Sequence, residues 1–210
     1  MTQVDTAPAT TDAAEGVVLS KTALAAVAAC FLLMGVLAAA YGPLLEHLAR
    51  RFEISLPVAS EVFSAHFAGA FVGVVAAMWA MERTPGRLSV WAALACEAVG
   101  CTAVALAPSW PTFLAGAFVI GLGFGGLDLG LNQLVAHSVG RRRSALLNGL
   151  NGAFGFGAVA APILISRFGQ AHLAVLYIGA ALLALALVPA AAGISGRLPV
   201  APRSTSCSVA

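Results

Sequence analysis

Charged side chains are scarce in this sequence. Asp, Glu, Lys and Arg make up only 10% of its 210 residues, whereas hydrophobic residues make up 60%. A water-soluble domain carries about 25% charged residues, which it needs to cover its surface. The apolar residues also come in long runs rather than in stripes at helical spacing, which is typical of a chain dissolved in lipid. The composition therefore excludes a soluble domain and predicts an integral membrane protein.

The four cysteines form no disulfide or metal-binding pattern, and the signatures of hydrolase sites are missing. Of the four cysteines, Cys30, Cys96 and Cys101 lie inside apolar runs and Cys207 lies in a polar tail. No Cys-x-x-Cys pair and no Cys/His pair at zinc spacing occurs, so we predict small packing residues, no disulfide framework and no metal site. The sequence also has no His-Glu-x-x-His and no Gly-x-Ser-x-Gly motif.

One glycine cluster imitates a nucleotide fingerprint. The segment from Gly121 to Gly126 matches Gly-x-Gly-x-x-Gly, but no strand precedes it, it lies inside an apolar run, and no acidic ribose partner follows. Close packing of helices through small residues explains it better, so we predict no cofactor. The glycines expected to pack helices are Gly121, Gly125, Gly126, Gly130 and Gly155.

Six segments are long and apolar enough to cross a bilayer, which takes about 20 residues for roughly 30 Å of hydrocarbon. Lipid leaves helices as the plausible structure for runs of this length, so the predicted fold class is an all-α integral membrane protein of six transmembrane helices. The spans lie near 22–45, 57–81, 87–107, 111–138, 144–166 and 171–193.

The two ends of the chain read as polar extensions of a membrane domain over 21–193. Residues 1–20 are rich in Thr and Ala and are expected to be a disordered cytoplasmic segment, and 194–210 a flexible cytoplasmic tail. The first apolar run contains Ala38-Ala39-Ala40, which resembles a signal-peptide cleavage site. The run is too long for that, and some twenty residues with acidic members precede it, so we expect a retained first span.

Basic residues predict one orientation, because cytoplasmic loops of membrane proteins are enriched in Lys and Arg. With the N-terminus in the cytoplasm, eight basic residues fall inside and three outside. This indicates a plasma or inner membrane protein with both termini cytoplasmic. The short Arg141–Arg143 run suits topology control and anionic lipid, not nucleic acid. The inside set is Lys21, Arg83, Arg87, Arg141, Arg142, Arg143, Arg197 and Arg203, and the outside set is Arg50, Arg51 and Arg167.

Two acids inside the spans are candidates for proton coupling. Asp128 and Asn132 are four residues apart and share a face of the fourth span, and Glu97 lies near the middle of the third. An ionised carboxylate at mid-bilayer costs a few kcal/mol, so each acid needs a partner or water. We expect Asp128 and Glu97 at similar depth. Either acid carries a proton through a transport cycle, or Asp128 and Asn132 form a structural pair that ties the fourth helix to its neighbours.

For four further polar residues, the sequence leaves a functional and a structural interpretation open. Glu61 and His66 of the second span lie about 140° apart on a regular helix, so they point in different directions. Glu61 serves substrate or proton access, or is simply hydrated near the interface. His66 transfers protons or is a packed neutral residue. Asn148 and Asn151, three residues apart on the fifth span, bind substrate or bridge helices.

Several motifs stand in a recognisable order. The first span holds Gly35 and ends in Tyr41-Gly42-Pro43-Leu44-Leu45, the second holds Gly69 and Gly73, and the fourth runs from Gly121 to Gln133. Leu147-Asn148-Gly149 and Ala161-Pro162 follow in the fifth. From Phe31 to Leu164 this order resembles the N-terminal half of the major facilitator superfamily, with the closest look to fucose-permease-like sugar and drug transporters.

The resemblance has one departure in its motifs. The superfamily's loop between helices two and three reads G-x-x-x-D-R-x-G-R-R. Here Glu82-Arg83-Thr84-Pro85-Gly86-Arg87 replaces it, without the leading Gly, with Glu for Asp and with an extra residue. Glu82, Arg83 and Arg87 are expected to supply the charges of this cytoplasmic gating loop. Helix three is peripheral in the family, which counts against Glu97 as a cavity residue.

The family has twelve spans in two similar halves with the substrate between them, and this chain carries six. The resemblance therefore implies a half-size transporter subunit that moves a small organic molecule by proton-coupled alternating access. It would work as a parallel homodimer or with a second six-helix chain. The alternatives are a membrane-embedded enzyme that uses Glu61, His66, Glu97 and Asp128 on a lipophilic substrate, and a regulatory half-transporter without a transport cycle.

Overall fold

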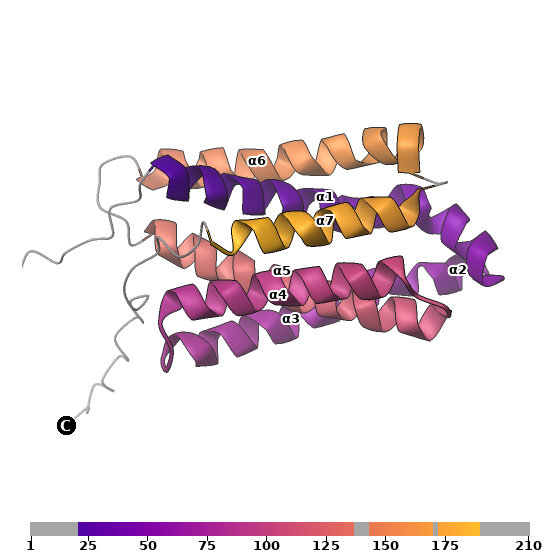
Figure 1. Ribbon diagram of the computed structural model, residues 1–210, viewed down its shortest axis with the longest axis horizontal. Helices are drawn as coiled ribbons and strands as arrows, with labels where there is room; N and C mark the ends of the chain where they lie inside the picture. Colours follow the sequence, from indigo (N-terminus) through magenta and orange to yellow (C-terminus); the bar gives the residue numbers. More distant parts are fainter. Residues whose placement is uncertain (1–20, 137–142, 170–171, 190–210) are drawn as a thin grey trace, which may run out of the picture.

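A bundle of helices running along one axis forms the computed structural model (Figure 1). The structure describes residues 21–136, 143–169 and 172–189, and these contain helices but no strand, which confirms the all-α class. The elements are α1 Lys21–Phe52, α2 Leu56–Ala59, α3 Glu61–Met81, α4 Gly86–Ala105, α5 Trp110–Ala136, α6 Arg143–Leu164, the π-helix Ile165–Gly169 and α7 Leu173–Leu187.

Five of the six predicted spans are confirmed as helices long and apolar enough to cross a membrane. The sixth, α7, has 15 residues, which at 1.5 Å per residue is about 22 Å, less than the hydrocarbon thickness. Its predicted range, 171–193, extends beyond the described residues. The segments expected to be disordered, 1–20 and 194–210, also lie outside them, as do Arg141 and Arg142.

The first helix is longer than the sequence predicted. The apolar run near 22–45 continues as helix to Phe52. Arg51 anchors this extension because its guanidinium donates a hydrogen bond to the carbonyl oxygen of Ala107 at 2.9 Å. Glu53, with a φ of 54°, ends the helix and turns the chain toward α2. We call this end of the bundle the Pro57 end, and the opposite end, which holds the α3–α4 loop, the Arg83 end (Figure 1).

Helices α3 and α5 run in the same direction and touch backbone to backbone. Two glycines on each helix, spaced four residues apart, allow this approach. A Cβ at any of the four would meet a backbone carbonyl oxygen of the facing helix. Small residues at this spacing let helices in lipid gain close van der Waals contact. The pairs are Gly69 with Phe118, Gly73 with Leu122, Gly121 with His66 and Gly125 with Ala70.

Helices α1 and α6 repeat this arrangement with different glycines. A Cβ on Gly35 would meet the carbonyl oxygen of Phe154, and one on Gly157 would meet that of Leu32. The packing role predicted for Gly155 therefore needs correction, because a Cβ there would meet nothing within 4 Å. Gly155 is two residues from Gly157, which places it about 160° around the helix, on the exposed side.

The other two predicted packing glycines, Gly126 and Gly130, lie farther from neighbouring helices than Gly121 and Gly125 do. A Cβ on Gly126 would lie 3.1 Å from the Cβ of Ala93. One on Gly130 would lie 3.7 Å from side-chain carbons of Met81 and Val90, which is an ordinary contact. Gly121 and Gly125 therefore make the tight contacts of α5 with α3. Gly123 makes one with α4, where a Cβ would lie 2.6 Å from the carbonyl oxygen of Ala93, and Gly130 makes none.

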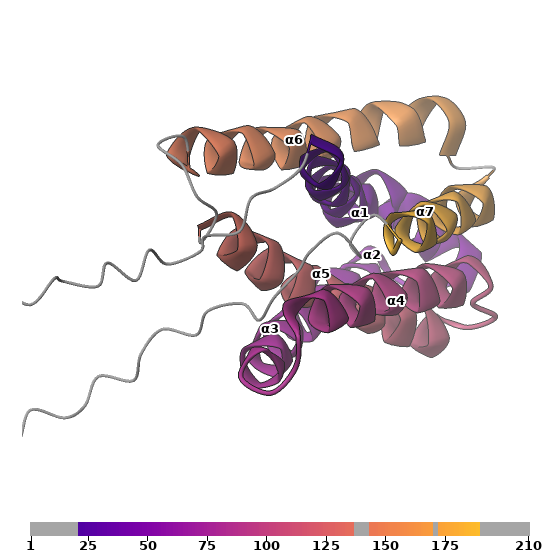
Figure 2. The ribbon, with the colours of Figure 1, turned by 60° about the vertical axis from the view of Figure 1, so that its left-hand side comes forward.

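The bundle has two parts joined by α7. Figure 2 shows α6 beside α1 on one side and α3, α4 and α5 together on the other. Helix α7 packs on α4 and also contacts α1. A direct contact between the two parts joins the rings of Phe124 on α5 and Phe154 on α6, whose centroids are 6.1 Å apart.

Candidate transport face

Four polar side chains predicted from the sequence fall on one side of the contact between Phe124 on α5 and Phe154 on α6, within about 12 Å of it along the helix axes. Helix α5 runs toward the Arg83 end and α6 runs away from it (Figure 1). Residues that follow Phe124 on α5 and residues that precede Phe154 on α6 therefore lie on the same side of the ring contact. We call this set, Asp128, Asn132, Asn148 and Asn151, the candidate transport face.

The helical rotation keeps these side chains near the contact between α5 and α6. At 100° per residue, Asp128 lies about 40° and Asn132 about 80° around α5 from Phe124. Asn151 lies about 60° around α6 from Phe154. Asp128 and Asn132 are partly exposed, and Asn151 is exposed. Asn148, also exposed, lies farther round, at about 120°.

The Asp128–Asn132 pair is a hydrogen-bonded unit within one helix. The Asn132 amide donates to the carbonyl oxygen of Asp128 at 2.8 Å and to its carboxylate oxygen at 2.9 Å. This bond fixes the direction of the carboxyl group. It does not join α5 to another helix, so the structural alternative in which the pair ties α5 to its neighbours is not supported. Asn151 likewise donates within its own helix, to the carbonyl oxygen of Leu147 at 2.9 Å.

Glu97 lies away from this face and deeper in the bundle. A Cβ on Gly123 would lie 2.6 Å from the Cγ of Glu97, which places Glu97 level with Gly123 on α5. Asp128 is five residues farther along α5, or about 8 Å nearer the Arg83 end. The expectation that the two acids share one depth is therefore wrong. Glu97 is also fully buried against α5, whereas Val99 two residues later is exposed, so Glu97 lies on the inner side of α4 and does not line the candidate transport face.

His66 lies in a cage of aromatic rings behind the transport face. Its Nδ1 is 3.3 Å from the hydroxyl oxygen of Tyr41. The rings of Tyr41, Phe67 and Phe124 surround it at centroid distances of 5.3–5.4 Å. Glu61 is exposed at the start of α3, so the two residues point in different directions, as their spacing predicted. His66 therefore contacts the face through Phe124 rather than lining it.

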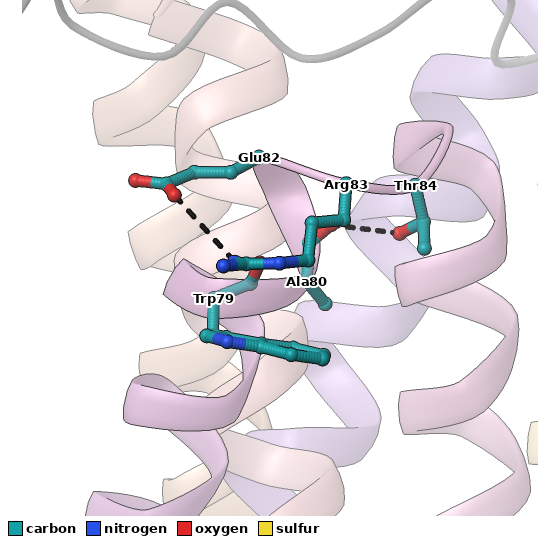
Figure 3. Close-up of polar contacts among 5 residues, drawn as sticks. All are labelled: Trp79, Ala80, Glu82, Arg83 and Thr84. Atoms are coloured by element: carbon teal, nitrogen blue, oxygen red, sulfur yellow. Dashed lines mark hydrogen bonds and ion pairs between the residues drawn. The ribbon is translucent and has the colours of Figure 1, made fainter.

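The α3–α4 loop is held by its own residues (Figure 3). The guanidinium of Arg83 lies 4.2 Å over the ring of Trp79, donates to the Trp79 carbonyl oxygen at 3.0 Å and pairs with Glu82 at 3.6 Å. The Thr84 hydroxyl donates to the carbonyl oxygen of Ala80 at 2.9 Å. Arg87 is exposed on the first turn of α4. Stacking on Trp79 is a feature that the loop motif alone did not predict.

Replacing Arg83 with alanine should loosen the end of α3 by a small amount. A cation–π contact at an exposed site contributes about 0.5–1 kcal/mol, and the Glu82 pair adds little because both side chains are exposed. We expect a slightly lower midpoint of unfolding in detergent and a change in Trp79 fluorescence. Arg87→Ala is the matched control, and equal effects of the two variants would contradict the stacking role.

The arrangement defines a class before any comparison with known proteins. It is a polytopic α-helical membrane protein with an acid and three amides on one side of the ring contact between two neighbouring helices. The chain matches the family model of the Major Facilitator Superfamily over residues 27–206 and belongs to that superfamily. No individual curated protein matches it. The resemblance at superfamily level is confirmed, whereas the likeness to sugar and drug transporters stays a prediction.

Sequence reasoning missed the aromatic residues that organise the site. Phe124, Phe154 and Tyr41 bring α1, α3, α5 and α6 together. Every span of the chain contains large apolar residues, and periodicity gives no signal for which of them meets another helix when lipid surrounds the bundle.

Proposed function

We propose that the chain is a transporter subunit that moves a small organic molecule across a membrane by alternating access. Membership of the superfamily supports a membrane transporter. The observation that carries the proposal is the candidate transport face, where Asp128 and Asn132 on α5 and Asn148 and Asn151 on α6 lie on the same side of the Phe124–Phe154 contact in mainly apolar helices. Polar side chains inside membrane spans are costly in free energy, and they commonly mark the pathway of a substrate or ion.

Each part of the face has a chemical role in this proposal. The amides of Asn132, Asn148 and Asn151 offer donors and acceptors to hydroxyl or carbonyl groups of a substrate. Asp128, held by Asn132 at 2.9 Å, binds and releases the coupling proton. The contact between Phe124 and Phe154 closes the face toward the Pro57 end, and its separation opens the alternative access state.

A second six-helix bundle completes the site in this proposal. Helix α3, which packs on α5, and helix α6, which carries Asn148 and Asn151, are the least buried of the five long spans, with 28% and 22% of their apolar windows buried. The superfamily places its substrate between two bundles related by an axis along the membrane normal. The second bundle is another copy in parallel orientation, which gives an isologous interface, or a different six-helix chain.

The basic residues of the sequence support one orientation. The cytoplasmic set predicted from the sequence includes Arg83 and Arg87, which are exposed at the Arg83 end. The positive-inside tendency then places this end in the cytoplasm of a plasma or inner membrane, with both termini on that side.

The first experiment combines particle mass with vesicle transport. The mass of the purified particle is measured in nanodiscs. For transport, the purified chain is reconstituted into sealed liposomes that contain a pH-sensitive dye. A panel of sugars and amphipathic metabolites is then added under a pH gradient. We expect a particle of two bundles and proton movement driven by at least one compound. A single-bundle particle that moves neither compound nor proton would contradict the proposal.

A further inference from the structure

We propose that Glu97 is a proton-binding site of the transport cycle, set inside the bundle and separate from the candidate transport face. The inference rests on the proposed function, since a cycle must move the helices for this site to be used. It depends on three properties of the residue: its burial, its neighbours and its lack of hydrogen-bond partners.

The Glu97 carboxyl group is enclosed and unpartnered. Its side chain is fully buried, and neither carboxyl oxygen has a hydrogen-bond partner among the described residues. Helix α5 covers it at Gly123, whose missing side chain leaves the space that the Cγ of Glu97 occupies. A buried polar group without a partner costs free energy, and an ionised one costs much more.

None of the groups that face Glu97 balances a negative charge. The titratable groups that interact with it are Cys30 and Tyr41 on α1 and Cys96 and Cys101 on α4. Tyr177 on α7 is buried beside Cys101, and α5 contributes Gly123 at this level. No Lys, Arg or His of the described residues interacts with Glu97. The neutral acid is therefore the form that fits this conformation.

A structural role does not explain the residue. An unpaired buried carboxyl adds no stabilising bond, and an apolar side chain of similar volume should pack there equally well or better. An acid at this site has a use if a second conformation lets water or another proton carrier reach it. Separation of α4 from α5 at Gly123 would do this.

Two groups with exchangeable protons, Tyr41 and His66, are in contact with each other close to Phe124, at the edge of the transport face. Tyr41 interacts with Glu97, and its hydroxyl oxygen is 3.3 Å from Nδ1 of His66. The His66 ring in turn packs on Phe124, at the edge of the face. We therefore assign Tyr41 and His66 as the route by which a proton passes between the face and Glu97 when the aromatic rings separate.

Infrared spectroscopy tests the protonation of Glu97 directly. The purified full chain in liposomes at neutral pH should show the carbonyl stretching band of a protonated carboxylic acid. The difference spectrum of wild type minus Glu97→Gln should contain this band, and the frequency of the band should shift in heavy water. Wild type and Glu97→Gln spectra that agree in this region would overturn the proposal.

Stability and transport separate a proton site from a packing residue. Glu97→Met should fold with an unfolding midpoint equal to or above that of wild type, and a lower midpoint would overturn the proposal. Both Glu97→Gln and Glu97→Met should lose accumulation driven by a pH gradient and keep exchange of internal for external substrate. Retained accumulation would also overturn it. If the wild type moves no compound, the proposed function fails, and the infrared band still decides whether Glu97 holds a proton.

Discussion

Replacing Gly125 with alanine is expected to destabilise the helix bundle strongly. The added Cβ would meet the carbonyl oxygen of Ala70 and lie 2.8 Å from its carbonyl carbon and 2.9 Å from the Val74 nitrogen. These are backbone atoms, so no side-chain rotation relieves the clash and α3 must move away from α5. We expect a loss of about 3 kcal/mol or more in the free energy of unfolding, at the upper end of overpacking effects.

The measurement is an unfolding titration in mixed micelles, and the chain supplies its own controls. A Cβ on Gly130 would make only ordinary contacts at 3.7 Å, and one on Gly155 would meet nothing within 4 Å. Alanine at either site should be neutral or slightly stabilising, because alanine favours the helix by up to about 1 kcal/mol over glycine. Similar losses for Gly125→Ala and Gly155→Ala would contradict the proposed packing of α3 on α5.

The contact pattern of the bundle follows an internal repeat. The chain splits into α1, α3 and α4, followed by α5, α6 and α7. Helix α3 of the first set packs on α5, the first helix of the second set, and α6 packs on α1 in the same way. Helices α4 and α7, the third of each set, pack on each other. These three pairings are preserved when the two sets are exchanged, as expected for the inverted repeats within each half of this superfamily. The extensive packing of α4 on α5 has only a slight counterpart between α7 and α1.

The two sets of helices differ in how deeply their polar residues are buried. The first helices of the two sets, α1 and α5, carry Tyr41 and Asp128, and the second helices, α3 and α6, carry His66 and Asn151. The first-set members are buried, while the second-set members are at least partly exposed. Of these four residues, the two of the first set thus lie in an enclosed layer with aromatic neighbours, and the two of the second set lie in an accessible polar layer.

The sequence predicted the class and most span positions because the apolar runs and their charged breaks depend on composition alone. It did not predict which side of each helix faces a neighbour. Gly155 and Gly157 are identical residues two positions apart, and only the rotation of α6 places Gly157 against Leu32. In water, hydrophobic periodicity reveals this rotation. In lipid, both sides of a helix are apolar and the signal is lost.

The relative levels of the polar residues were equally hidden. The expectation that Glu97 and Asp128 lie at the same depth assumed that α4 begins and α5 ends at one plane on the cytoplasmic side. The contacts of Gly123 show instead that α5 extends farther toward the Arg83 end than α4 does. Asp128 and Asn151 lie on the same side of the contact between Phe124 and Phe154, which sets the register of α5 and α6, and no motif in the sequence encodes that ring contact.

Replacing Asp128 with asparagine is expected to abolish accumulation driven by a pH gradient while leaving the fold intact. The new amide oxygen can accept the Asn132 hydrogen bond that the carboxylate accepts at 2.9 Å, so the geometry of the face is kept. An amide neither takes up nor releases a proton in this pH range. Substrate exchange without a gradient should therefore persist, since it needs binding but no net proton movement.

The control for this result is Glu61→Gln, which neutralises an exposed acid at the start of α3. It should leave accumulation near the wild-type level, because Glu61 lies outside the candidate transport face. Uptake into sealed liposomes, with and without a pH gradient, measures both effects. Wild-type accumulation by Asp128→Asn would remove Asp128 from the coupling mechanism and leave Glu97 as the acid that carries the proton. Loss of both accumulation and exchange would instead indicate that the charge of Asp128 binds the substrate itself.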